Sequence, residues 1–65
     1  MIDAFVEMLR GKLRKDMNNY ADDIATRKCK TFEEYQFMCG VIQGLALAER
    51  YMLDLKQELE TEADE

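Results

Sequence analysis

The residue types that usually carry chemistry are sparse in this chain, and their spacing does not form a reactive set. The sequence has no histidine, two cysteines and fourteen acidic residues among its 65 positions. Without histidine, the chain lacks the commonest general base and the commonest metal ligand. Cys29 and Cys39 do not form a Cys-x-x-Cys pair, and no other ligand set accompanies them. We therefore expect two free thiols in a reducing compartment.

Paired carboxylates are the remaining candidates for acid–base chemistry. They occur as Asp22-Asp23 and Glu33-Glu34, but neighbours on a helix point about 100° apart and do not converge on one substrate atom. Glu49 lies in an otherwise apolar stretch, where a charge can pair with Lys or Arg on a facing helix and fix register. We predict a non-enzyme with no catalytic residues, no metal site and no cofactor.

Composition favours a small helical protein. Hydrophobic residues form 48% of the chain, proline is absent and only three glycines are present, which is too little turn material for a many-stranded sandwich or barrel. A chain below roughly 70–80 residues seldom builds a sufficient core without disulfides, a metal or oligomerisation. We expect one domain over residues 1–65, and no membrane span, because the longest apolar stretch is far shorter than the roughly 20 residues needed.

Helical periodicity is clear in the first segment, where apolar residues recur at steps of three or four. This pattern predicts an amphipathic helix over about residues 2–27. The apolar positions are Ile2, Phe5, Leu9, Leu13, Met17, Tyr20 and Ile24. Near its end Asp23 precedes Arg27 by four residues, the favourable order for a helical ion pair.

A loop at about 28–31 separates this helix from a second one over about 32–60. The second helix begins with a capping-box pattern, in which Thr31 accepts from the amide of Glu34 and the Glu34 carboxylate accepts from the amide of Thr31. Because the connection has only about four residues, the helices should fold back as an antiparallel hairpin. The acidic end at 60–65 is expected to fray, since acids are unfavourable at a helix C-terminus.

The second helix carries two apolar sets. The first alternates steps of three and four, as in a coiled coil, and is predicted to form the intramolecular seam with the first helix. Its members are Met38, Val41, Leu45, Ala48, Met52, Leu55 and Leu59. The second set lies about 120° further round the helix and is predicted to contact another subunit or a partner. Its members are Phe37, Gly40, Gly44, Leu47 and Tyr51.

Two glycines on the second set favour a close contact between helices, because small residues let two backbones approach. The alternative is that this set wraps around the first helix. The predicted fold class is all-α: an antiparallel two-helix hairpin that self-associates into a four-helix bundle dimer or a higher oligomer.

Charge is distributed unevenly along the chain. Residues 1–32 hold seven bases and five acids, whereas residues 33–65 hold two bases and nine acids. An acidic second half argues against a nucleic-acid binder, which needs a basic face. A candidate basic contact patch comprises Arg10, Lys12, Arg14 and Lys15. It would touch phosphate, an acidic partner surface or the acidic end of a neighbouring chain, or it is a solvated face.

The run Cys29-Lys-Thr-Phe-Glu-Glu-Tyr35, followed by Cys39-Gly-Val-Ile-Gln-Gly-Leu-Ala-Leu-Ala-Glu-Arg50, resembles a group of short proteins encoded by tailed bacteriophages. The resemblance extends over residues 26–53 and carries over no catalytic residues. It implies a phage product, often encoded among virion-morphogenesis genes and usually of unassigned role. The host cytoplasm during infection, or the virion, would then be its location.

The function predicted from these features is that of a non-enzymatic helical oligomer, a small virion component or assembly factor of a phage. Its first partner would be itself, and other phage structural proteins or a host protein are further candidates. The alternative is a phage-encoded inhibitor or sequestering protein that binds a host factor or a small signalling ligand. The copy number of the oligomer and the role of the acidic end stay open.

Overall fold

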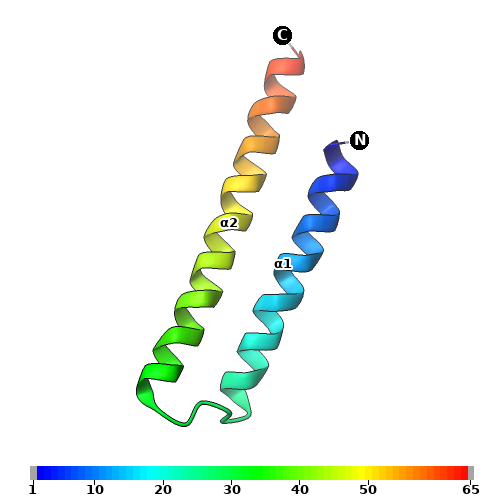
Figure 1. Ribbon diagram of the computed structural model, residues 1–65. Coiled ribbons are helices and arrows are strands. Elements are labelled where there is room, and N and C mark those ends of the chain that lie inside the picture. The colour runs from blue at the N-terminus through cyan, green and yellow to red at the C-terminus, as the bar shows by residue number, and fades with distance from the viewer. Residues whose placement is uncertain (1, 65) are drawn as a thin grey trace.

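A computed structural model describes the backbone of residues 2–64 and the side chains of residues 2–61. It contains two helices, α1 (Ile2–Ala25) and α2 (Phe32–Asp64). They lie side by side and antiparallel, in an elongated hairpin of 52 × 17 × 11 Å, with α2 extending past the N-terminus of α1 (Figure 1). No strand occurs in the part of the chain that is described. The predicted all-α hairpin is confirmed, and its self-association stays a prediction.

α1 ends at Ala25, two residues before the expected end. The amide of Lys28 donates to the carbonyl of Asp23 at 2.9 Å and the amide of Arg27 to that of Ile24 at 3.2 Å, the two bonds of a Schellman cap. Arg27 adopts φ = 61°, the left-handed region that favours glycine. The predicted Asp23–Arg27 pair is therefore replaced: Asp23 pairs with Lys28 at 3.4 Å, because Arg27 has left the helix.

α2 begins as the capping pattern predicts. The amide of Glu34 donates to the Thr31 hydroxyl at 3.1 Å, and the amide of Tyr35 donates to the Thr31 carbonyl at 3.1 Å. The reciprocal bond differs by one residue, since the Glu34 carboxylate accepts from the amide of Lys30 at 2.7 Å. Thr31 therefore caps the helix, and the Glu34 carboxylate also ties the loop to its first turn.

The acidic end of α2 stays helical to Asp64, beyond the expected end near residue 60. Lys56 approaches Glu60 at 3.9 Å, one turn further on, and the Thr61 hydroxyl donates to the carbonyl of Gln57 at 2.9 Å. Glutamate, alanine and lysine are good helix formers, so local propensity continues the helix in spite of unfavourable charge at its C-terminus.

The interior between the two helices is thin. Among the described side chains, the buried apolar residues are Val6 and Met17, and the buried charged residue is Glu49. The chain exposes 5432 Å², whereas a compact folded protein of this mass exposes about 4,300 Å². The hairpin therefore leaves about 1,100 Å² more surface in water than a compact monomer of its size would.

Candidate interaction surface

The contact line between the helices includes a charged position. α2 turns one line of buried or half-buried residues toward α1: Met38, Ile42, Leu45, Glu49, Met52 and Lys56. Four members of the predicted seam are half-buried, namely Met38, Val41, Leu45 and Met52, while Ala48, Leu55 and Leu59 are exposed. The inner position belongs to Glu49 instead of Ala48, because two arginines of α1 hold its carboxylate.

Glu49 pairs with α1 through a bidentate contact. Arg14 Nε and Nη2 each donate to one carboxylate oxygen at 2.7 Å, and Arg10 Nε lies 3.6 Å from Glu49 Oε2. The hydrogen bond from Arg14 lowers the pKa of Glu49, and the same bond raises the pKa of Arg14. The predicted pairing of Glu49 across the hairpin is confirmed. Because the Arg14 guanidinium and the Glu49 carboxylate are both planar, their two parallel hydrogen bonds form in one alignment of the helices, and the pair fixes the register of the hairpin.

The candidate basic patch is divided by this pairing. Arg10 and Arg14 lie one turn apart on the side of α1 that holds Glu49. Lys12 and Lys15 are exposed and project from other sides of the helix, since residues two apart lie about 200° apart. The four residues therefore do not act as one contact patch.

The two cysteines lie near the loop end and are free thiols. Cys29 Sγ donates to Met38 Sδ at 3.2 Å, and both residues are half-buried. Burial, with a smaller contribution from Glu34, raises the pKa of Cys29, and a hydrogen bond with Cys39 raises the pKa of Tyr35. A raised thiol pKa leaves little thiolate at neutral pH, so Cys29 is a weak nucleophile. Within the described residues, no three His, Cys, Asp or Glu residues are grouped to hold a metal ion.

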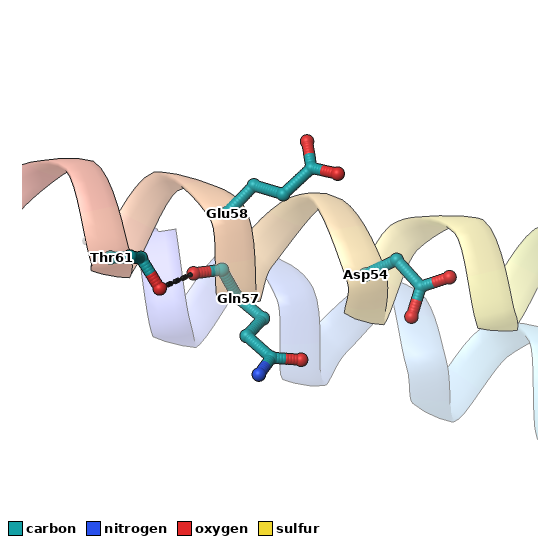
Figure 2. A pocket seen from close by; sticks show the side chains of 4 residues that line it. All are labelled: Asp54, Gln57, Glu58 and Thr61. Carbon is teal, nitrogen blue, oxygen red and sulfur yellow. Dashed lines mark hydrogen bonds between the residues drawn. The ribbon is translucent and has the colours of Figure 1, made fainter.

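A polar hollow lies on the outer surface of α2 (Figure 2). It is lined by Asp54, Gln57, Glu58 and Thr61, all from successive turns of one helix, while α1 passes behind. The hydrogen bond of Thr61 in this view goes to a backbone carbonyl of its own helix. Because one exposed helix provides every lining side chain, the hollow does not enclose a substrate or shield a reacting group from water.

The second apolar set of α2 faces solvent. All five of its members are exposed, with Phe37 and Tyr51 each at 66%. A Cβ placed on Gly40 or Gly44 would meet no other atom within 4 Å. The alternative that this set wraps around α1 is therefore wrong. Nothing within the hairpin accounts for two glycines in the middle of α2, where each costs helix stability.

Exposed apolar residues from both predicted sets share one side of α2. We define the apolar stripe as the apolar residues and glycine within about 40° of one line along the helix, at 100° per residue. They are Phe37, Val41, Gly44, Ala48, Met52, Leu55 and Leu59. All are exposed except Val41 and Met52, which are half-buried. The stripe lies about 90° from the line that faces α1, along one long edge of the hairpin contact.

α1 adds apolar residues to the same broad side of the hairpin. Arg10 and Arg14 lie on one side of the contact line of α1, where both form ion pairs with the Glu49 carboxylate. Phe5 lies on the opposite side by helical periodicity, and it lines a shallow apolar groove with Met8, Leu9 and Lys12. The hairpin thus has a charged broad side and an apolar face, defined as the stripe of α2 together with Phe5 and Leu9 of α1.

Comparisons with protein-family models, curated proteins and solved structures give no match for this chain. The resemblance to short phage proteins therefore stays a prediction. Neither helix, over its described residues, has an apolar stretch long enough to cross a bilayer.

Proposed function

We propose that this chain is a non-enzymatic assembly protein that works by self-association through its apolar face. The observation that carries the proposal is the surplus of exposed surface, about 1,100 Å² above that of a compact monomer, on a chain that exposes 5432 Å². A stable protein–protein interface removes about 800 Å² from each partner. A second copy that covers the apolar face would therefore remove most of the surplus.

The site chemistry supports binding over catalysis. The most buried carboxylate, Glu49, is held by two arginines at 2.7 and 3.6 Å and is not available to a substrate. Burial raises the pKa of the Cys29 thiol, which weakens it as a nucleophile, and the hollow on α2 is open along one helix. Large exposed apolar patches on a small chain mark surfaces that bind other proteins.

The resemblance to short phage proteins provides the biological setting of the proposal. In that setting the oligomer is a small virion component or an assembly factor. Either would be present in the host cytoplasm during infection, and a virion component would also be present in the particle. Mass spectrometry of purified particles tests this setting. Absence from particles together with recovery of a host protein would favour the inhibitor alternative, with the apolar face as its binding surface.

Self-association itself is tested by sedimentation and by thermal unfolding at several protein concentrations. We expect a mass above that of the monomer and a melting temperature that rises with concentration, because association stabilises only the folded state. Leu55→Glu places a charge on the apolar stripe and should dissociate the oligomer. Gln57→Glu is the matched control on the outer surface of α2 and should not. A monomeric mass with a concentration-independent melt would refute the proposal.

A further inference from the structure

We propose that two copies pair through α2 in antiparallel orientation, with a two-fold axis that passes beside Ala48. This arrangement rests on the proposed self-association and specifies its geometry. The product is a four-helix bundle in which the two loops lie at opposite ends and the two apolar faces are buried against each other.

The spacing of the apolar stripe supports the two-fold axis. From Phe37 to Leu59 the stripe advances by four, three, four, four, three and four residues, a series that is the same in both directions. A two-fold axis at its middle member therefore brings every position of the stripe opposite another position of the stripe. Such a surface is self-complementary, as an isologous dimer contact requires. The mean of the end positions is residue 48, which is the middle member itself.

The side-chain sizes along the stripe fit two crossing helices. Packed helices in bundles cross at about 20°, so they are closest at the crossing point and separate toward the ends. Ala48 would meet the partner's Ala48 at the crossing, and Gly44 would lie under the partner's Met52. Phe37 would lie opposite the partner's Leu59, where the wider gap needs large side chains. The open space around Gly44 in the single hairpin is then filled by the second copy.

Disulfide trapping tests the register. In a Cys29→Ser, Cys39→Ser background, Ala48→Cys should form an intermolecular disulfide under mild oxidation, because the geometry needs Cα atoms within about 7 Å. Gln43→Cys, on the polar side of the same helix, is the control and should cross-link at least tenfold more slowly. A mixture of Val41→Cys and Leu55→Cys chains should give the mixed disulfide, since these positions are opposite each other, whereas either chain alone should not.

The outcomes separate this inference from the proposed function. The mixed disulfide between positions 41 and 55, with no disulfide from either chain alone, supports the antiparallel register. Cross-linking at Ala48 shows that the stripe is the contact, since residue 48 would face its own copy in a parallel pair as well. Disulfides from the Val41→Cys chain alone or the Leu55→Cys chain alone would indicate a parallel pair and refute the register. An oligomer in sedimentation that gives neither cross-link refutes the register and leaves self-association intact. A monomer in sedimentation for the unsubstituted chain refutes both. Circular dichroism of each variant verifies that the helices are present.

Discussion

Replacing Gly44 by alanine separates a monomeric hairpin from the proposed dimer. Gly44 and Gly11 are both inside helices, and a Cβ at either position meets no other atom within 4 Å of the single chain. Alanine is better than glycine in a helix by about 1 kcal/mol. In a chain of this size that gain raises the melting temperature by about 4–8 °C. A monomeric hairpin would therefore be stabilised equally by both substitutions.

The dimer predicts different results for the two glycines. Gly11 projects away from α2 and from the apolar face, so Gly11→Ala keeps the whole gain of about 1 kcal/mol. Gly44 would lie under the partner's Met52, and overpacking such a contact costs typically about 1–3 kcal/mol. Gly44→Ala should then leave the melting temperature unchanged or lower. The bulkier Gly44→Leu should force the helices apart, while the monomer keeps its helix content.

The assay is thermal unfolding by circular dichroism at matched protein concentration, with sedimentation of each variant. Gly11→Ala serves as the control for helix propensity alone. If Gly44→Ala raises the melting temperature as much as Gly11→Ala does, the face is exposed in solution and the reasoning is refuted. A Gly44→Leu variant that melts higher and keeps the mass of the oligomer would refute it as well.

Three further predictions concern charge, backbone and thiols. The pKa of Glu49 is lowered below its ordinary value of 4.5 by its hydrogen bond with Arg14, so its contribution to stability is present above that pH and is lost as the pH falls through the lowered pKa. Glu49→Gln should flatten this acid part of the melting-temperature profile, and Glu58→Gln, at an exposed site, should not. Arg27→Gly should raise the free energy of unfolding by about 1 kcal/mol in urea denaturation, because φ is 61° at this position. An unchanged free energy of unfolding would contradict the left-handed cap. Reductant should change neither the oligomer mass nor the melting temperature, and a thiol reagent should modify Cys29 slowly at pH 7, since its pKa is raised; a reductant-sensitive dimer would contradict this.

The features that sequence predicted well are local ones. The 3.6-residue periodicity of apolar positions predicted both helices, and the type and spacing of Thr31 and Glu34 predicted the start of α2. The early end of α1 was missed because its left-handed cap residue is Arg27, and the usual marker of such a cap is glycine. Helical periodicity alone could have predicted that the candidate basic patch is divided between sides of the helix, since Arg10 and Arg14 are four residues apart while Lys12 lies between them.

The orientation of α2 about its own axis was not predictable from the apolar pattern alone. The heptad pattern placed Ala48 inside, because it treats a glutamate as a surface residue. The decisive contact joins Arg14 to Glu49 across 35 positions of sequence, and no local pattern contains it. Two hydrogen bonds at 2.7 Å turn Glu49 inward, and Leu55 and Leu59 are left facing solvent.

This orientation of α2 also accounts for the exposed apolar face on which the proposed self-association rests. This ion pair fixes register but adds little to stability, because the Arg14 side chain is 55% exposed and water screens its attraction to Glu49. Three residues of the predicted seam, Ala48, Leu55 and Leu59, are exposed on the stripe instead. The inner position of Glu49 therefore leaves apolar surface for the proposed association. Glu49→Leu should therefore give a hairpin with a more apolar interior and a less well-defined register, which would weaken the match between apolar faces. A variant that folds more stably as a monomer yet associates less well is the expected result, measured by sedimentation and thermal unfolding together.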